Sequence, residues 1–361
     1  AIQHFAESAL HRAAQSARAR SGTALVLEPE TGRVLALAVF PPFDPNRYRR
    51  NRPENWRLHG ITTVFEPGSI FKIVTMAAYL EGRGGSPADI FDCKKGRFRV
   101  AGRRIRDAHP YSVLSVARVL EVSSNICTIQ IAQAVGPTTL YRYIRRLGFG
   151  SPTRSGLPAE PAGLVRPPRR WSRTSIAAVP IGQEVSVTAL QVVLAYGAIA
   201  NGGYLMRPRL VREIRDAGEV VRVFAPKIVR RALRPKTVRI LKDMLAGVVQ
   251  RGTGKAAKPR GYTAAGKTGT AQQVDPATRT YSKDRYVASF VGFAPVENPR
   301  VVIFVALDHP KTHTFGGVVA APVFREIAEK TLRYLRVPSN ETPLIRAAGG
   351  DGTGRTPPDR V

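Results

Sequence analysis

The segments that favour β-strands lie at the two ends of this chain, and the part between them is largely helical. Near the N-terminus, residues 23–28 and 33–39 are apolar, and Pro29-Glu-Thr-Gly32 joins them as a tight turn. Near the C-terminus, strand-like runs cover 262–274, 285–294 and 301–307. Apolar runs bounded by turn residues predict strands, and the first two runs predict a hairpin. A single sheet must then be assembled from both ends of the chain, with the middle inserted.

Helical patterns dominate the intervening part, from about residue 81 to 255. Apolar periodicity predicts helices over 69–80, 112–134, 186–200 and 236–250. Asn201-Gly202-Gly203 is a typical end for the third of these helices. Residues 318–336 predict a closing helix. The expected fold is therefore α+β: an antiparallel sheet built from both chain ends, with an inserted all-helical lobe.

The same pattern suggests the domain organisation. We expect residues 1–20 to be the remnant of an upstream linker or helix, because the chain opens without Met in what reads as the middle of a helix. Residues 21–336 are expected to form one domain. Residues 337–361 are rich in Gly, Pro and polar side chains and predict a disordered tail. The sequence has no run of about eighteen apolar residues, so no segment of it predicts a membrane-spanning helix.

The formal net charge of +30 is extreme for a chain of 361 residues. Such a surface attracts polyanions: nucleic acid, anionic lipid or acidic wall polymer. A nucleic-acid-binding protein is not indicated, because the sequence shows no recognition helix, aromatic stacking platform or finger. The basic residues are spread along the chain, so we interpret the charge as mostly solvated surface.

The two cysteines, Cys93 and Cys127, do not make a disulfide framework. Their separation neither requires nor forbids a bridge, and the apolar surroundings of Cys127 are typical of a small core residue. The six histidines show no ligand spacing such as HExxH. We therefore expect neither a metal nor a cofactor.

The motif Ser69-Ile-Phe-Lys72 follows Glu66-Pro67-Gly68 and begins a predicted helix. A serine at a helix start has an unpaired backbone N–H and a favourable dipole for an oxyanion. Lys72 lies one turn away on the same face, where a neutral amine can take the serine proton if burial and a nearby positive charge lower its pKa. Alone the motif is weak: Ser-x-x-Lys occurs by chance about once in a chain of this length, usually as an N-cap with a surface lysine.

Ser123-Ser124-Asn125 is also weak alone, since a helix N-cap or a loop explains it equally well. In a catalytic interpretation, it presents a hydroxyl and an amide to a cleft from the helical lobe. Ser123 then passes a proton to a leaving amine, and Asn125 holds Lys72 and the substrate backbone.

Lys267-Thr268-Gly269-Thr270 is more specific, because it lies in a strand-like run that also contains Gly266. Glycines inside a strand suggest close approach by another group. Lys267 supplies a second positive charge, Thr268 and Thr270 supply hydroxyls for a carboxylate, and the N–H of Thr270 completes an oxyanion hole with that of Ser69. The motif is not a P-loop, since it lacks the leading GxxxxG spacing.

In this order and setting, the chain resembles the penicillin-binding protein transpeptidases, specifically the monofunctional class B enzymes. The resemblance rests on Glu66-Pro-Gly-Ser-Ile-Phe-Lys72, Ser123-Ser-Asn125 and Gly266-Lys-Thr-Gly-Thr-Ala-Gln272, with Gly182-Gln-Glu-Val-Ser-Val-Thr188 and Gly252-Thr-Gly-Lys-Ala256 in support. It covers about residues 1 to 336. The sequences of the KTGT and SSN motifs resemble those of the septal, division-type enzymes. The loop Asp107-Ala-His-Pro-Tyr111 is less typical of the family. The implied fold is the one shared by penicillin-binding proteins and serine β-lactamases.

The resemblance implies a serine D,D-transpeptidase that cross-links peptidoglycan stem peptides ending in D-Ala-D-Ala. Ser69, deprotonated by Lys72, would attack the penultimate D-Ala carbonyl, and Ser123 would help to protonate the departing D-Ala. The substrate carboxylate would be held by Lys267, Thr268, Gly269 and Thr270. A neighbouring stem-peptide amine would then take the acyl group, and β-lactam antibiotics would acylate the same serine.

The resemblance also implies a setting. The enzyme would act at the periplasmic or extracytoplasmic face of the inner membrane, on lipid II-derived strands, with divisome proteins that include a glycosyltransferase. Relatives carry an N-terminal membrane anchor and a non-catalytic pedestal domain, both of which we expect to have been trimmed from this chain. No cofactor and no nucleic acid are implied.

Three alternatives remain open at this point. A serine β-lactamase shares the nucleophile, the lysine and the carboxylate clamp, but it requires a deacylating group that no motif here supplies. A non-enzymatic β-lactam sensor domain would be acylated and then signal. A basic nucleic-acid-binding module would use the positive charge and none of the three motifs.

Overall fold

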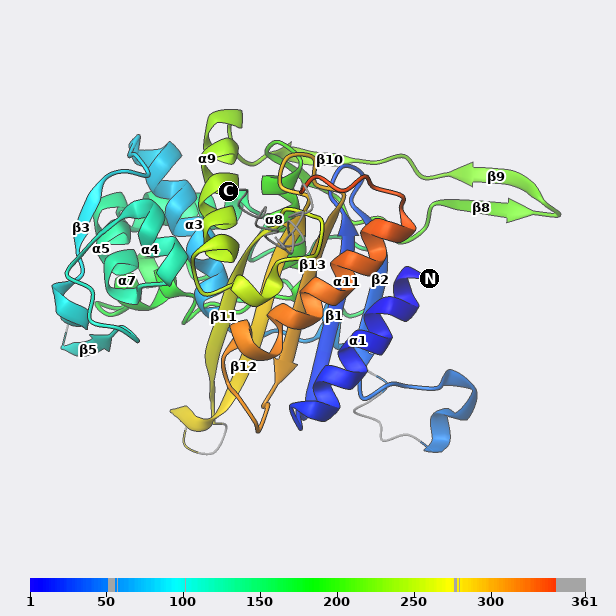
Figure 1. Ribbon diagram of the computed structural model, residues 1–361, viewed down its shortest axis with the longest axis horizontal. Coiled ribbons are helices and arrows are strands. Elements are labelled where there is room, and N and C mark those ends of the chain that lie inside the picture. The colour runs from blue at the N-terminus through cyan, green and yellow to red at the C-terminus, as the bar shows by residue number, and fades with distance from the viewer. Residues whose placement is uncertain (51–55, 57, 101, 276–277, 279, 342–361) are drawn as a thin grey trace, which may run out of the picture.

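The computed structural model describes residues 1–50, 56, 58–100, 102–275, 278 and 280–341. Its centre is one five-stranded sheet in the order β11-β12-β13-β1-β2, with every pair antiparallel (Figure 1). The strands are β1 Ser21–Glu28, β2 Arg33–Phe40, β11 Ala265–Val274, β12 Tyr281–Ala294 and β13 Val301–Asp308. Two strands come from the N-terminal end and three from the C-terminal end, as the apolar runs predicted.

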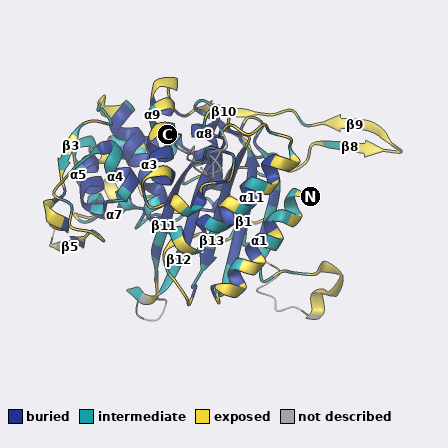
Figure 2. Cartoon of the chain, in the orientation of Figure 1, coloured by how far each residue is buried: buried dark blue, intermediate teal, exposed yellow. Residues whose placement is uncertain are grey.

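The two ends of the chain meet where β1 pairs with β13, with Leu25 opposite Phe304 and Val26 opposite Ile303. Both faces of the sheet are covered, so successive residues of β1 enter different cores (Figure 2). Burial on both faces explains why these strands read as continuous apolar runs and do not alternate with polar residues.

One face of the sheet is covered by α1 (Ile2–Ser16) and α11 (Ala321–Tyr334), which lie side by side (Figure 1). Leu10 of α1 and Phe324 of α11 are fully buried in one core with Ile303. The sequence-based boundary treated residues 1–20 as an upstream remnant, but α1 packs on the sheet as part of this core. The predicted tail over 337–361 lies mostly outside the described residues, which end at residue 341.

The opposite face carries α8 (Ala189–Ala200), which is buried along its whole length between the sheet and the inserted lobe. A capping box fixes its start: Gln191 N donates to the Thr188 hydroxyl, and Thr188 N donates to the Gln191 side chain. The lobe helices are α3 Lys72–Ala77, α4 Val116–Val122, α5 Asn125–Val135, α6 Pro137–Arg146, α7 Ser175–Ala178 and α9 Pro235–Gln250. Two short α-helices lie outside this set, α2 His59–Thr62 and α10 Gly316–Val319.

The predicted fold class is confirmed, but the inserted lobe is not entirely helical. The chain between β2 and β11 forms four two-stranded ribbons: β3 Ile90–Asp92 with β6 Val113–Ser115, β4 Arg97–Val100 with β5 Arg103–Arg106, β7 Tyr204–Met206 with β10 Ile228–Arg231, and β8 Glu213–Asp216 with β9 Glu219–Val223. The last of these ribbons projects away from the lobe helices (Figure 1). Each strand has three to five residues, and several are mostly charged. Strands this short and polar give almost no period-two signal, so the sequence reading missed them.

Two predicted helices differ in detail from the structure. The segment over 69–80 is helical but changes type, from a 3-10 turn η3 (Gly68–Phe71) through α3 to a π-helical turn η4 (Ala78–Arg83). The single helix predicted over 112–134 is wrong, since the chain breaks between α4 and α5 at Ser123 and Ser124. Among the described residues, no helix is long and apolar enough to cross a membrane.

Candidate active site

Ser69 lies in the 3-10 turn η3, between the sheet and the lobe, and its side chain is half-buried. The turn lies against β11: a Cβ on Gly68 would come within 3.0 Å of Ala271 Cβ, and one on Gly269 within 3.0 Å of Ile70 Cγ2. Gly68 has φ +56°, a conformation that other residues rarely adopt. Among the described residues, Ser69 Oγ makes no hydrogen bond. The direct Ser69–Lys72 contact suggested by the spacing is therefore not made in this structure.

Lys72 begins α3 and is fully buried. Its Nζ donates to Asn125 Oδ1 over 2.7 Å, to the backbone oxygen of Ser123 over 2.6 Å and to Ser123 Oγ over 3.2 Å. The contact expected between Lys72 and Asn125 is thus present. These three acceptors hold the Lys72 amine against Ser123 and Asn125 of the second motif.

Ser123 occupies the break between α4 and α5 in a left-handed conformation, with φ 63° and ψ 35°. A non-glycine residue held in this region costs about 1 kcal/mol or more and persists only where its surroundings impose it. Here the conformation turns both the carbonyl oxygen and the hydroxyl of Ser123 toward Lys72. Ser124 then caps α5 by accepting a bond from Cys127 N over 3.1 Å.

The third motif lies on β11, which is the edge strand of the sheet next to the lobe. Lys267 is fully buried, and its Nζ donates to Ser123 Oγ over 2.9 Å. A Cβ at Gly266 would meet Phe290 at 2.5 Å, and one at Gly269 would meet Ser289 Oγ at 2.3 Å. The prediction that these glycines allow close approach by other groups is confirmed.

The two threonines of this strand have partners that the sequence reading did not anticipate. The hydroxyl oxygens of Thr268 and Thr253 are 2.7 Å apart, and Thr253 N donates to Glu121 O over 3.2 Å. Gly316 N, at the start of α10, donates to Thr270 Oγ1 over 3.4 Å. Thr253 therefore connects the strand that carries the third motif to the segment that leads into the second.

Burial changes the proton affinities of both lysines. It lowers the pKa of Lys72 from 10.5 to about 7, and Asp107 opposes this by attracting the protonated form. The pKa of Lys267 is held well below its ordinary value, first by burial and then by the charge of Lys72. A lysine with a pKa near 7 is partly neutral at neutral pH, as a general base requires.

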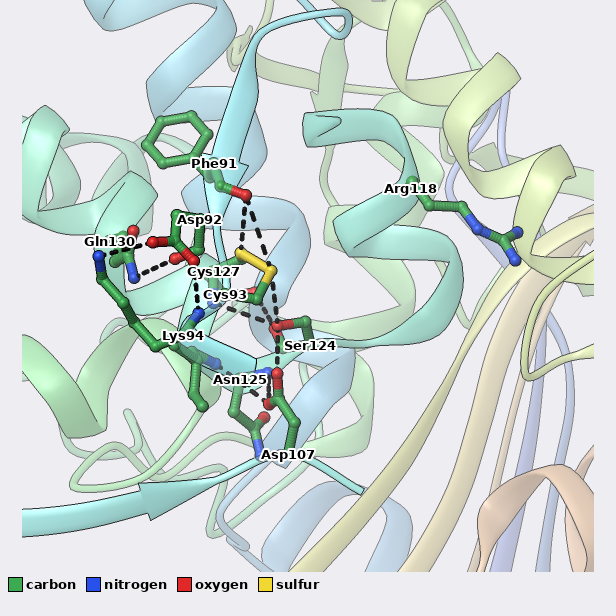
Figure 3. Close-up of a disulfide and its surroundings, with 12 residues drawn as sticks. Phe91, Asp92, Cys93, Lys94, Asp107, Arg118, Ser124, Asn125, Cys127 and Gln130 are labelled. Atoms are coloured by element: carbon green, nitrogen blue, oxygen red, sulfur yellow. Dashed lines mark hydrogen bonds and ion pairs between the residues drawn. A yellow bond between two sulfur atoms is a disulfide. The ribbon is translucent and has the colours of Figure 1, made fainter. Parts of the chain in front are cut away.

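Asp107 is a site residue that the sequence reading noted only as part of an untypical loop. Its carboxylate accepts from Ser124 Oγ over 2.5 Å, from Asn125 N over 2.6 Å and from Ile126 N over 3.2 Å (Figure 3). It therefore binds the N–H groups at the start of α5 that have no acceptor within the helix, where the helix dipole also favours a negative charge. The position of Asn125 at the head of this helix depends on these bonds.

A disulfide between Cys93 and Cys127 reinforces the same corner (Figure 3). Its Cα atoms are 5.0 Å apart, and it joins the segment after β3 to the first turn of α5. Ser124 lies between the bridge and Asp107, with Ser124 Oγ 3.8 Å from Cys93 Sγ. Both cysteines are fully buried, so the expectation of a core position for Cys127 is confirmed, and the pairing left open by the sequence is now assigned.

The structure therefore gathers Lys72, Ser123, Asn125 and Lys267 into one hydrogen-bonded group, with η3 and β11 packed beside it. The two lysines are buried, whereas Ser69, Ser123, Asn125 and Thr270 are each half-exposed. Such an arrangement can supply an accessible serine hydroxyl, a partly neutral amine as a base, a hydroxyl between two amines and a second amine for a carboxylate. Within the described part of the chain, no group of three or more His, Cys, Asp or Glu side chains is arranged to hold a metal ion.

Comparison with known proteins gives one consistent result. Residues 22–329 match the family described as penicillin binding protein transpeptidase domain. The chain is 37% identical to penicillin-binding protein PbpB of Mycolicibacterium smegmatis over 95% of its own length and 54% of that protein, and 34% identical to stage V sporulation protein D of Bacillus subtilis over 87% and 49%. Penicillin-binding protein 3 of Mycobacterium tuberculosis, solved in complex with aztreonam, superposes with a TM-score of 0.87 at 36% identity, covering 94% of this chain and 78% of that one. The chain spans about half the length of the curated relatives it matches.

Proposed function

Because this chain belongs to the penicillin-binding protein transpeptidases of the division-type class B, we propose that it is a peptidoglycan D,D-transpeptidase that works through a Ser69 acyl-enzyme in septal wall synthesis. The observation that carries the proposal is the position of Lys72. The amine is buried, its pKa is lowered to about 7, and it is hydrogen-bonded to both Ser123 and Asn125 one helical turn after Ser69.

In the first half of the reaction, neutral Lys72 takes the proton of Ser69 as Ser69 Oγ bonds to the carbonyl carbon of the penultimate D-Ala. The N–H groups of Ser69 and Thr270 hold the oxyanion. The bond from that carbon to the nitrogen of the terminal D-Ala then breaks. Ser123 gives a proton to this nitrogen and is reprotonated from the lysines bonded to it, so free D-Ala leaves.

In the second half, the amine of a neighbouring stem peptide attacks the acyl carbon, and the Ser69 ester bond breaks. The amine gives up a proton, which returns through Lys72 to Ser69 Oγ. One amide bond is exchanged for another, so the reaction needs neither a cofactor nor an external energy source. Exclusion of water from the acyl-enzyme favours the amine over water as the acceptor of the acyl group.

Substrate recognition is assigned to the edge strand. A peptide that lies along β11 pairs with its free edge, as in other strand-addition complexes. Lys267, Thr268 and Thr270 bind the terminal carboxylate, and Gly269 lets Ser289 and Ile70 pack close to this strand. A β-lactam, which mimics this terminus, acylates Ser69 in the same position, and the aztreonam complex of the similar M. tuberculosis protein supports this.

The setting follows from the same family. We assign the protein to the extracytoplasmic face of the inner membrane of the bacterial envelope, where lipid II-derived strands and their stem peptides are cross-linked. Its proposed partners are divisome proteins, including a glycosyltransferase. In the full-length protein, an N-terminal membrane anchor is proposed to hold the domain at this face.

Labelling with a fluorescent penicillin tests the mechanism. The wild-type chain should be labelled covalently, Ser69→Ala should lose the label while keeping its melting temperature, and Ser16→Ala, an exposed serine on α1, should label normally. Labelling that persists in Ser69→Ala would overturn the assignment of the nucleophile. Rapid turnover of a chromogenic cephalosporin would instead indicate a β-lactamase.

A further inference from the structure

The ribbon formed by β4 and β5 presents four arginines on one face. Arg97 lies directly opposite Arg106, and Arg99 lies directly opposite Arg104. Directly opposed residues of an antiparallel pair share a face, and so do residues two apart along a strand. All four side chains are exposed. We call these residues the arginine face.

The orientation of the ribbon is fixed by its other face. Ile105 is 7% exposed and packs in a small core with Ile126 and Ile129 of α5, and Phe98 and Val100 pack against the same core. A one-residue slip or a flip of the ribbon would bring guanidinium groups into this core. The arginine face is therefore held toward solvent.

Nothing in the described part of the protein offsets this concentration of charge. Among the described residues, none of the four arginines makes an ion pair or a side-chain hydrogen bond. The exposed Lys95 adds further charge before β4, whereas Lys94 is paired with Asp92. Like charges directly opposite one another on a ribbon are destabilising. Neighbouring parts of the lobe do provide carboxylates for other arginines, such as Glu121 for Arg118 and Arg251. An anionic ligand would remove the repulsion that this ribbon carries.

The geometry favours phosphate over carboxylate. A guanidinium is a planar fork of donors that binds either group, but a carboxylate accepts mainly in its own plane. The Cβ atoms of directly opposed side chains are about 5 Å apart. The two opposed pairs, Arg97–Arg106 and Arg99–Arg104, are here called rungs, and they are about 6.8 Å apart along the strands. A phosphodiester can accept from the two arginines of one rung, and a polymer whose phosphates recur at about this interval can occupy both rungs.

We propose that the arginine face binds a linear polyol-phosphate polymer of the cell envelope. The choice of an envelope polymer over nucleic acid rests on the proposed function, which places the domain outside the cytoplasm. Arg106 directly precedes Asp107, the residue that caps the helix of Asn125. The polymer would therefore be held on the lobe, beside the segment that leads into Asp107.

Binding of a fluorescent glycerol-phosphate oligomer, followed by anisotropy at a series of salt concentrations, tests this proposal. Arg99→Gln with Arg104→Gln removes one rung. We expect the affinity at low salt to fall at least about tenfold, and the slope of log K against log salt to decrease by about 0.7–0.9 for each phosphate that the variant no longer binds. The melting temperature should stay the same or rise, because an opposed pair of like charges has been removed.

The matched control is Arg239→Gln with Arg325→Gln, which removes two exposed arginines from α9 and α11 that make no ion pair within the described chain. It should leave binding within about twofold of wild type. An equal weakening in this control would show that bulk charge alone attracts the oligomer, and equal binding of a polyglutamate of matched charge would refute phosphate recognition. Tighter binding of a single-stranded oligonucleotide would replace the envelope polymer with nucleic acid as the occupant.

The variant that lacks the rung should still be labelled by fluorescent penicillin at the wild-type rate, since none of its substitutions touches the site. If wild type is not labelled at all, the proposed function fails, but the oligomer measurement still decides whether the arginine face binds phosphate.

Discussion

Lys72 and Lys267 hydrogen-bond to the same atom, the hydroxyl oxygen of Ser123, over 3.2 and 2.9 Å. Both amines are fully buried, and the charge of Lys72 disfavours a proton on Lys267. Near neutral pH, the two amines together therefore favour a state with fewer than two protons. Ser123 lies between a base and a cation, a position suited to moving a proton from one side of the site to the other.

The charge of Asp107 should set the pH at which acylation switches on. Because acylation in the proposed mechanism needs neutral Lys72, its rate should rise as the pH increases through about 7. Asp107 raises the pKa of Lys72, so Asp107→Asn should move the midpoint of the pH–rate profile to lower pH. The measurement is the second-order rate of acylation by fluorescent penicillin as a function of pH.

Asp243→Asn, which removes an exposed carboxylate from α9, serves as the control and should leave the midpoint unchanged. If the Asp107→Asn midpoint stayed in place or moved to higher pH, the electrostatic role of Asp107 would be wrong. A loss of stability alone, without a shift of the midpoint, would mean that Asp107 acts only as the cap of α5.

Thr253→Val should slow acylation although Thr253 belongs to none of the three motifs. The change keeps the shape of the side chain but removes the hydroxyl that lies 2.7 Å from Thr268 Oγ1. We expect acylation to slow by roughly fivefold to tenfold, the size of one net hydrogen bond. Thr138→Val, an exposed position on α6, is the matched control.

A double-mutant cycle with Thr268→Val distinguishes the mechanism. If Thr253 acts by orienting the Thr268 hydroxyl, the double variant should be little worse than Thr268→Val alone. Fully additive effects would show that the two threonines act independently.

The buried Lys72 should lower the stability of the fold at neutral pH. Its pKa falls from 10.5 in the unfolded chain to about 7 in the fold, so between these values the unfolded chain binds the extra proton. Stability of the wild type should therefore rise with pH across this window, by about 4 kcal/mol for this one group.

Thermal denaturation of Lys72→Met across the same pH range measures this contribution. The melting temperature of the variant relative to wild type should be highest near pH 7 and should decline as the pH approaches 10.5. Lys255→Met, at an exposed position, should follow wild type at every pH. If the melting temperatures of Lys72→Met and wild type changed with pH in parallel, the destabilisation assigned to burial of the Lys72 amine would be wrong.

The central sheet was predictable because its strands are buried on both faces and leave long apolar runs in the sequence. The three motifs were predictable as a set because their order and their glycines are unusual together. The break at Ser123 was predictable only in part, because Ser123-Ser124-Asn125 is typical of a helix N-cap or a loop, whereas apolar periodicity predicted one continuous helix over 112–134. The left-handed conformation of Ser123 is imposed by contacts with Lys72, which lies 51 residues earlier.

Long-range partners account for the other omissions. Asp107 contacts Ser124 across 17 residues, and Thr253 contacts Thr268 across 15, distances at which sequence periodicity carries no information. The family-like stretch around Gly252 and Gly254 did mark the neighbourhood of Thr253, although not its role. The pairing of Cys93 with Cys127 depends on the packing of β3 beside α5, which the sequence spacing does not specify.

The Cys93–Cys127 bridge makes maturation of the site depend on the compartment in which the chain folds. Cysteines become a stable cross-link only where thiols are oxidised, and reducing cytosol keeps them apart. Cys127 lies two residues after Asn125, so a chain held among reducing thiols lacks the covalent tie at the head of the helix that presents this side chain. Oxidation thus completes the lobe chemically, and protein purified from a reducing host should be oxidised before its penicillin labelling is compared with that of the cross-linked form.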